Sequence, residues 1–299
     1  MKNLCGVVPA TVTPLNRDQS IDGGAYGRIF ENMMRHGCSG AMVMGTVGEG
    51  LELSRKQYEN GVCAAVKAMD GRGPIVANTS DIRFDQVVLN TQVAAEAGAA
   101  FALNVPPFYN SVTQDIIYSF YMRLADESRL PVLIYNIPEN TKNAVAVDTV
   151  LKLKRHENIA GIKDSSGNMA YFQQLVYRCK ADDFCVFMGK APLVGQAMVA
   201  GASGTMTPLP NMQPAWETEI HRLVKEGRLE ELRTASLRIL SLVGLYLDSK
   251  YSISHTIKAI MSKQGLCQPY TAGFVPVMEE EASQRLFERC LALGGEWKL

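Results

Sequence analysis

The sequence lacks the features of membrane, secreted and nucleic-acid-binding proteins. No segment approaches the roughly 18 consecutive apolar residues of a membrane helix. The first residues lead directly into a strand pattern, without the apolar stretch and cleavage site of a signal peptide. The 30 Lys and Arg residues balance the 30 Asp and Glu residues, so no net charge attracts nucleic acid or anionic lipid. We therefore expect a cytoplasmic protein that acts on a small molecule, with no nucleic acid and no membrane as partner.

The sequence also lacks the spacing of a disulfide framework or a metal site. Its seven cysteines are odd in number and scattered, and no two of them form a C-x-x-C pair. None of its four histidines ends a predicted strand or lies near an acidic cluster with ligand spacing. We therefore predict no bound metal, and reduced cysteines that are mostly buried as small apolar residues.

The common nucleotide-binding motifs are missing as well. A dinucleotide-binding fold carries G-x-G-x-x-G after its first strand, and a phosphate loop carries G-x-x-x-x-G-K-[ST]. Here the first predicted strand leads to Thr13 and Pro14, and the glycines at positions 45, 48 and 50 have another spacing and follow the second strand. These absences argue against a nucleotide-binding oxidoreductase on an open sheet.

What the sequence does contain is a regular change of apolar period. Short runs rich in Val, Ile and Ala alternate with stretches in which apolar residues recur every three or four positions, a pattern that predicts strands alternating with helices. The predicted strands are residues 5–13, 40–44, 74–78, 100–105, 131–135, 159–163, 184–188 and 202–206. The clearest intervening helices are residues 54–69, 84–97, 113–127 and 169–179.

Eight such units predict the α/β class and a (β/α)8 TIM barrel, which typically takes about 250 residues. A doubly wound open sheet is the structural alternative. After residue 210 the strand pattern ends, and helices are predicted at residues 214–226, 229–248, 254–263 and 278–293. We predict a catalytic barrel domain over residues 1–225 and a C-terminal helical extension, residues 226–299, that packs on the barrel.

The ends of the predicted strands carry the residues that could perform chemistry, because catalytic groups in a barrel lie at the carboxyl ends of its strands. Lys163 closes an apolar run, so its stem should be buried and its amine should reach the barrel mouth. Burial favours the neutral amine that a Schiff-base nucleophile needs, although such a lysine can also extend to solvent. Tyr135 and Thr46 end strands at the same edge, where a phenol and a hydroxyl could relay protons to an imine. Alternatively, Tyr135 is a packed aromatic residue.

Three motifs at strand ends give the chain a specific resemblance. They are Gly45-Thr46-x-Gly48-Glu49, Tyr135-Asn136-x-Pro138 and Gly161-Ile162-Lys163-Asp164-Ser165-Ser166-Gly167. Because these three motifs occur in this order at the strand ends, the chain resembles the dihydrodipicolinate synthase / N-acetylneuraminate lyase superfamily over essentially its whole length.

The resemblance implies a role for each matching residue. Lys163 would form a Schiff base with a 2-oxo acid such as pyruvate, so that no metal or other cofactor is needed. Tyr135 would be the general acid/base and Thr46 its relay partner. Tyr109 would enter the active site of a neighbouring subunit, which implies a homodimer or homotetramer.

The resemblance also implies a substrate-binding surface. The turn after the second strand would present backbone N–H groups to the substrate carboxylate. The residues predicted to contact substrate are Val47, Gly48, Asn140, Ser165, Gly189 and Met206.

Three positions depart from the best-known members. Val47 replaces a residue that usually bears a hydroxyl. Asn140 stands where synthases of the lysine pathway carry an arginine, and an amide cannot form the bidentate charged pair. Residues 189–192 lack the Asp-Glu pair of sialic acid lyases, and Lys190 there indicates either an anionic or hydrogen-bonding distal group or a solvated surface lysine.

We therefore predict a carbon–carbon lyase of the class I aldolase kind. Its substrate would be a 2-oxo-3-deoxy sugar acid or a 4-hydroxy-2-oxo acid, cleaved to or condensed from pyruvate and an aldehyde, or dehydrated. Dihydrodipicolinate synthase and N-acetylneuraminate lyase are alternative activities. An alternative from another class is a non-catalytic barrel that binds a 2-oxo acid.

Overall fold

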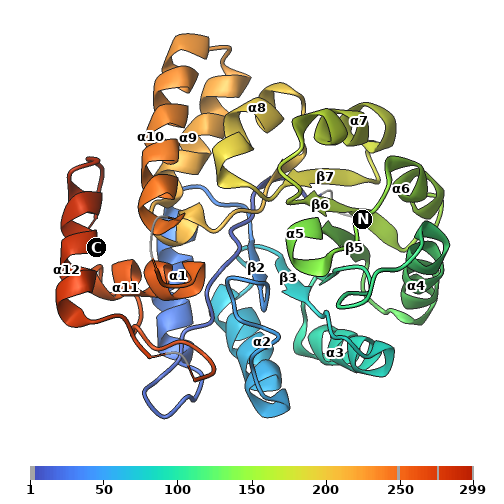
Figure 1. Ribbon diagram of the computed structural model, residues 1–299, viewed down its shortest axis with the longest axis horizontal. Helices are drawn as coiled ribbons and strands as arrows, with labels where there is room; N and C mark the ends of the chain where they lie inside the picture. The colour runs from blue at the N-terminus through green and yellow to red at the C-terminus, as the bar shows by residue number, and fades with distance from the viewer. Residues whose placement is uncertain (1–3, 248–249, 275, 298–299) are drawn as a thin grey trace.

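A computed structural model describes residues 4–247, 250–274 and 276–297 and shows eight strands surrounded by helices (Figure 1). The strands are β1 (Gly6–Val7), β2 (Ala41–Val43), β3 (Ile75–Asn78), β4 (Phe101–Asn104), β5 (Val132–Asn136), β6 (Ile159–Asp164), β7 (Cys185–Met188) and β8 (Gly204–Thr205). The helices are α1 (Gly23–Arg35), α2 (Arg55–Met69), α3 (Phe84–Ala97), α4 (Gln114–Glu127), α5 (Pro138–Thr141), α6 (Val147–Leu153), α7 (Met169–Cys179), α8 (Val194–Val199), α9 (Pro214–Lys225), α10 (Leu229–Leu247), α11 (Ile253–Lys263) and α12 (Glu280–Leu291). Two short 3-10 helices, η1 (Ala191–Leu193) and η2 (Leu209–Asn211), follow β7 and β8.

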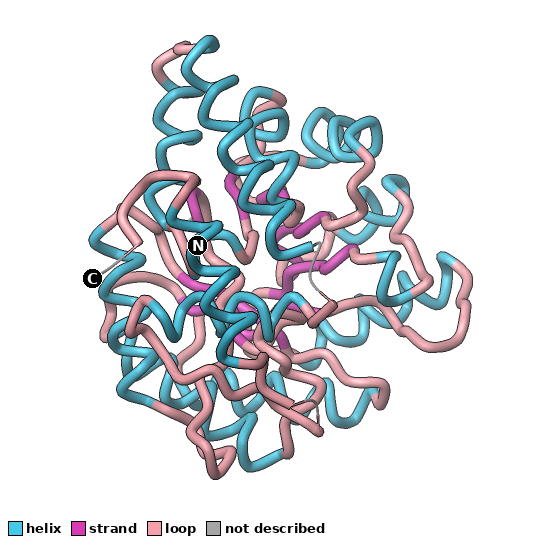
Figure 2. The backbone as a smooth tube through the Cα atoms, turned by 60° about the vertical axis from the view of Figure 1, so that its left-hand side comes forward, coloured by secondary structure: helices cyan, strands magenta, loops and turns pink. Residues whose placement is uncertain are grey.

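The sheet is parallel and closes on itself. Its strands are bonded in the order β1-β8-β7-β6-β5-β4-β3-β2. The gap between the two ends is bridged where the Met42 N–H donates to the Pro9 carbonyl at 2.8 Å and the Thr11 N–H donates to the Met42 carbonyl at 2.8 Å. Figure 2 shows the strands at the centre with the helices outside them. The predicted (β/α)8 barrel is confirmed, and the open sheet is excluded.

The first strand is shorter than the sequence indicated. Regular pairing with β8 covers only β1. Pro9 faces β2, where it accepts a hydrogen bond from Met42 but has no N–H to donate. The segment beyond β1 joins the β8 side, where the Val8 and Ala10 N–H groups donate to the Thr205 and Thr207 carbonyls at 2.9 Å each. It joins β2 through the bonds with Met42. The prediction of a strand over residues 5–13 was therefore too long, although the segment completes the barrel.

Alternation along β6 decides which side chains reach the barrel interior, because successive residues of a strand point to opposite faces. Ile162 is buried in the cluster that packs strands against helices, together with Phe172 and Leu175 of α7. Lys163 instead contacts Met42, which belongs to the cluster inside the barrel. The strand thus turns its apolar residue outward and its lysine inward.

The C-terminal helices lie at one side of the barrel (Figure 1). Helix α10 packs against α9 and η1, and α11 packs against α10 and α12. No helix in the described ranges is both long and apolar enough to cross a membrane. The boundary between a barrel domain and an extension at residue 225 stays a prediction, and α11 returns to the barrel through Lys258, as described below.

Candidate active site

Lys163 lies at the end of β6 and is 3% exposed. The register of β5 and β6 places Tyr135 beside it. The Lys163 Nζ atom is 4.1 Å from the centre of the Tyr135 ring and 3.4 Å from the Met42 sulfur. Among the described residues no carboxylate lies within ion-pair distance of this amine. A buried lysine that is not held by a carboxylate has the placement a nucleophile requires.

Tyr135 is buried at the end of β5, and its hydroxyl lies 3.5 Å from the Thr46 hydroxyl. Burial on its own would raise the pKa of this phenol. The charge of Lys163 and the side-chain hydrogen bonds of Thr46, Lys163 and Ser165 outweigh burial, and the pKa of Tyr135 is lowered from its usual value. A phenol with a lowered pKa gives up its proton more readily, which suits a proton shuttle.

The turn after β2 leaves several backbone N–H donors unused, that of Thr46 among them, within the described residues. The Glu49 N–H donates to the Thr46 carbonyl at 3.1 Å, and the Gly50 N–H donates to the Gly45 carbonyl at 3.2 Å. Within the described part of the chain, the N–H groups of Val47 and Gly48 have no acceptor. Adjacent free donors of this kind can hold a carboxylate.

Only glycine fits at position 48, since a Cβ atom there would lie 2.9 Å from the Thr11 carbonyl oxygen. The close approach is to backbone, which cannot move aside as a side chain can. The turn therefore packs against the segment that follows β1.

Gly189 leaves room for the stem of Lys163. A Cβ atom at position 189 would lie 2.9 Å from the Lys163 Cε atom and would collide with the Ser165 hydroxyl. The Gly189 N–H donates to the Asp164 carbonyl at 2.7 Å, which fixes the distance between β6 and the segment after β7. The sequence predicts a substrate contact at Gly189, and in the structure its backbone borders the lysine.

Met206 is fully buried inside the barrel, in the same cluster as Met42 and Tyr135. It therefore lies in the barrel interior, and its contact with substrate stays a prediction. Ser165 is also buried, and its N–H donates to the Asn136 carbonyl at 2.8 Å.

Asp164 and Asn136 support the strand ends, a role not predicted from the sequence. The Asn136 amide donates to the Asp164 carboxylate at 2.8 Å, and the Ser166 N–H and hydroxyl donate to it at 3.1 and 2.9 Å. Burial raises the pKa of Asp164, and these hydrogen bonds offset part of that rise. Their presence in the same motifs as Lys163 and Tyr135 was the available signal.

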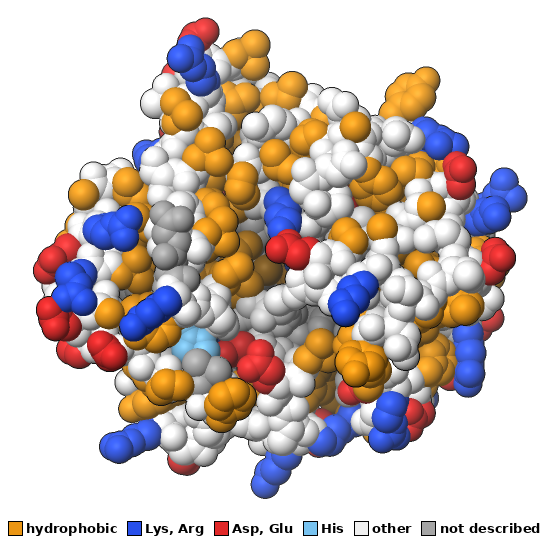
Figure 3. Space-filling model, viewed as in Figure 1, with side chains coloured by type: hydrophobic (Ala, Val, Ile, Leu, Met, Phe, Trp, Pro, Cys, Tyr) orange, Lys and Arg blue, Asp and Glu red, His pale blue; other side chains and the backbone are white. Residues whose placement is uncertain are grey.

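A cavity of about 240 Å³ borders the proposed relay residues. Of the predicted site residues, Thr46, Tyr135 and Asn140 line it. The buried Lys163 lies beside the Tyr135 ring without lining the cavity, and the residues that also do not line it are Val47, Gly48, Ser165, Gly189 and Met206. Figure 3 shows the molecule hollowed near the centre of the face seen in Figure 1, with apolar side chains along the edge. Tyr109 is not brought into this group, because it is 74% exposed on the loop after β4.

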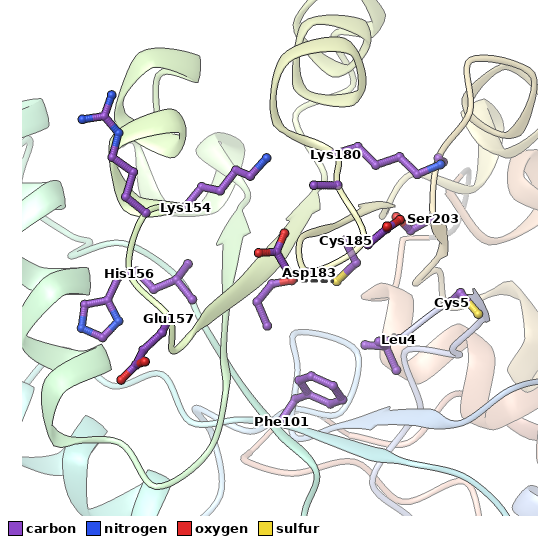
Figure 4. A pocket seen from close by; sticks show the side chains of 16 residues that line it. Leu4, Cys5, Phe101, Lys154, His156, Glu157, Lys180, Asp183, Cys185 and Ser203 are labelled. Carbon is purple, nitrogen blue, oxygen red and sulfur yellow. Dashed lines mark hydrogen bonds between the residues drawn. The ribbon is translucent and has the colours of Figure 1, made fainter. Parts of the chain in front are cut away.

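A larger cavity of about 1160 Å³ lies at the opposite end of the barrel (Figure 4). Its wall includes the first residues of three strands, Phe101, Ile159 and Cys185, and charged side chains such as Lys154 and Asp183 surround it. None of the predicted site residues lines it. Because barrel chemistry takes place at the carboxyl ends of strands, the smaller cavity is the candidate active site.

The chain is similar to proteins of one family over almost all of its length. Residues 3–289 match the model of the dihydrodipicolinate synthetase family. The 4-hydroxy-tetrahydrodipicolinate synthase of Xanthomonas axonopodis pv. citri is 29% identical over 293 residues, which cover 97% of this chain and 96% of the relative. The Xylella fastidiosa enzyme of the same name is 31% identical over 225 residues, which cover 75% and 74%. The structure of dihydrodipicolinate synthase from Bacteroides thetaiotaomicron superposes with a TM-score of 0.92 at 27% identity, covering 97% of this chain and 98% of that one.

Proposed function

This chain belongs to the dihydrodipicolinate synthetase family, and from that membership we infer a carbon–carbon lyase of the class I aldolase kind that forms a Schiff base with pyruvate. The observation that carries the residue assignment is the buried Lys163 amine, 4.1 Å from the ring of Tyr135 at the barrel mouth. We propose Lys163 as the nucleophile, Tyr135 as the general acid/base and Thr46 as its relay partner.

The proposed reaction starts at the Lys163 amine. Its Nζ atom adds to the C2 carbonyl of the 2-oxo acid and forms a carbinolamine. Tyr135 delivers a proton to the departing hydroxyl, water leaves and the imine remains. The imine accepts the electron pair of the C3–C4 bond while Tyr135 takes the C4 hydroxyl proton, which releases an aldehyde and leaves an enamine. Protonation at C3 and addition of water then return pyruvate and free Lys163, and condensation follows the same steps in reverse.

The Val47 and Gly48 N–H groups are proposed to hold the substrate carboxylate. A valine side chain offers no hydrogen bond, so the backbone of the turn must supply the donors that a hydroxyl at this position would otherwise share. A charge-assisted hydrogen bond contributes roughly 1.5–3 kcal/mol, so two backbone donors can hold the carboxylate in place.

Borohydride trapping tests this function. The protein is incubated with pyruvate, reduced with sodium borohydride, digested and mapped by mass spectrometry. The expected result is a pyruvate-derived mass increase on Lys163, which is absent when borohydride or pyruvate is left out. A folded protein that carries no adduct, or carries it on another lysine, would contradict the assignment.

The distal half of the substrate is proposed to contact Lys190. The Lys190 Nζ atom lies 2.8 Å from the Glu139 carboxylate. This ion pair joins the segment after β7 to the segment after β5, across the end of β6. The Lys190 side chain is 36% and the Glu139 side chain 72% exposed, and such a pair contributes only about 0–1 kcal/mol. A substrate anion can therefore replace Glu139 at little cost.

Lys190→Gln is expected to raise KM about tenfold for 2-oxo acids that carry a second carboxylate, because about one charge-assisted hydrogen bond is lost. KM for a 2-oxo-3-deoxy sugar acid with a neutral tail should stay the same. The measurement is steady-state cleavage of both substrates by the two proteins. Lys142→Gln, which removes another exposed lysine after β5, is the matched control and should change neither value. Equal effects of Lys190→Gln on both substrates would contradict this assignment.

Tyr109 is proposed to complete the site of a second copy of the chain. It is 74% exposed with a φ of 77°, and Leu51 and Ile82 on the two preceding loops are 58% and 61% exposed. A partner that covers this apolar surface would explain all three exposures.

Subunit complementation tests the shared site. Tyr109→Phe and Lys163→Met proteins should each be impaired alone and regain activity when refolded together. The mixed dimer pairs an intact Lys163 with an intact Tyr109 from the other subunit. Unchanged low activity in mixed dimers, with dimer formation verified by sedimentation, would rule out the exchange.

A further inference from the structure

Glu49 links the turn after β2 to the C-terminal helices through a buried ion pair. Its carboxylate contacts the Lys258 Nζ atom of α11, and the two side chains are 1% and 0% exposed. The Ala272 N–H donates to the same carboxylate at 3.2 Å, and Lys258 also donates to the Tyr270 carbonyl at 2.9 Å. The turn after β2 thus meets α11 and the segment that follows α11 at one carboxylate.

The backbone of the turn is in a conformation that needs such support. Met44 and Glu49, at its two ends, have φ angles of 59° and 55°. This left-handed region is disfavoured for residues with a side chain and persists where the surroundings fix it. The Asn78 amide donates to the Met44 carbonyl at 2.8 Å at one end, and the ion pair with Lys258 holds Glu49 at the other.

Stability alone is a weak explanation for a buried ion pair. Desolvation of two charges offsets most of their attraction, and well-packed apolar residues often serve equally well. A buried pair does, however, fix the position of the groups that bear it, since neither charge can move without losing its partner. Here the fixed group is the residue directly after the Val47 and Gly48 donors.

We propose that Glu49 and Lys258 are positioning residues, which orient the Val47 and Gly48 N–H groups toward the substrate carboxylate. This inference rests on the proposed function, because it assumes that the turn binds pyruvate there. The pair matters more in this chain because Val47 has no hydroxyl that could grip the carboxylate if the backbone shifted. Lys258 does not line the active-site cavity, and both oxygens of the Glu49 carboxylate are held by Lys258 and the Ala272 N–H. The effect of the pair is therefore on carboxylate binding and not on the chemistry at Lys163.

Measuring adduct formation with two carbonyl compounds separately distinguishes a positioning role from an effect on stability. The readout is the concentration that gives half-maximal borohydride adduct on Lys163, for pyruvate and for hydroxyacetone, a ketone of similar size without a carboxylate. Lys258→Met should raise the pyruvate value about tenfold, close to the effect of one lost charge-assisted hydrogen bond. The hydroxyacetone value should change less than about twofold, since it needs no carboxylate grip. Lys263→Met is the matched control, because Lys263 lies on the same helix and pairs with Glu280 at the surface.

A variant that lacks both charges shows whether the effect of Lys258→Met on pyruvate trapping is due only to misfolding. The Glu49→Gln/Lys258→Met protein leaves no unpaired buried charge, so its melting temperature should recover relative to Lys258→Met while its pyruvate value stays raised. Recovery of pyruvate trapping together with stability, or a parallel change for both ketones, would overturn the positioning role alone. A wild-type protein that forms an adduct with hydroxyacetone but not with pyruvate would overturn the proposed function and this inference together.

Discussion

Lys163→Met is expected to abolish both turnover and the borohydride-trapped pyruvate adduct. Methionine keeps the length and apolar character of the side chain and removes the amine, so no covalent intermediate can form. The space at Gly189 and beside Met42 accommodates an unbranched side chain, as it does the lysine stem. The measurement combines steady-state cleavage of a good substrate with intact-mass analysis after reduction.

A matched control lies at the other end of the barrel. Lys154 lines the large cavity shown in Figure 4, and Lys154→Met should leave the adduct and the turnover unchanged. Turnover near the wild-type rate in Lys163→Met would remove the Schiff-base mechanism from this protein. A loss of activity in Lys154→Met, with Lys163 intact and the protein folded, would instead point to chemistry at the large cavity.

Tyr135→Phe is expected to lower kcat by about 10²–10⁴-fold, the usual contribution of a positioned general acid/base. The ring that packs beside Lys163 remains, so pyruvate binding should change little, and the adduct should form more slowly but to the same final extent. The steps expected to slow down are dehydration of the carbinolamine and proton transfer at the C4 hydroxyl. Single-turnover trapping and steady-state cleavage measure the two effects separately.

Two further variants distinguish this role from a general effect on packing. Tyr121 is another buried tyrosine, whose hydroxyl donates to the Asn104 carbonyl at 2.7 Å, and Tyr121→Phe should lower stability without changing kcat. Thr46→Val removes a hydrogen bond that lowers the pKa of Tyr135. The pKa of the phenol should therefore rise, and the pH–rate profile of Thr46→Val should move toward higher pH. A Tyr135→Phe protein within about twofold of the wild-type kcat would refute the assignment, since positioned acid/base catalysis contributes far more.

The alternation of strands and helices is visible in the sequence because the strands are buried on both faces and form short apolar runs, whereas each helix buries one face against them. The predicted helices at residues 84–97 and 169–179 agree with α3 and α7, since apolar spacing and capping residues are local signals. Helix α1 was harder to identify from local pattern. Its sequence contains three glycines, which disfavour helix, yet Ile29, Phe30 and Met33 are buried against the barrel and stabilise it.

The active-site residues also fall into two groups, those whose positions follow from the sequence and those whose contacts do not. The positions of Lys163, Tyr135 and Thr46 follow from their strands, because parallel strands in a barrel bring their carboxyl ends to one edge. The spatial meaning of Gly189 does not follow from the sequence, since it depends on the distance between neighbouring segments. The pairing of Glu49 with Lys258 also leaves no local pattern, because 209 positions separate the two residues.

That separation sets the order in which the active site can be completed during synthesis. Lys163, Tyr135 and Thr46 are all synthesised before the last third of the chain. The contact of Glu49 with Lys258 and Ala272 requires residues near the end of the chain. A growing chain on the ribosome can thus contain the nucleophile and its proton relay while the turn beside them still lacks its anchor, and that anchor arrives only with the last helices.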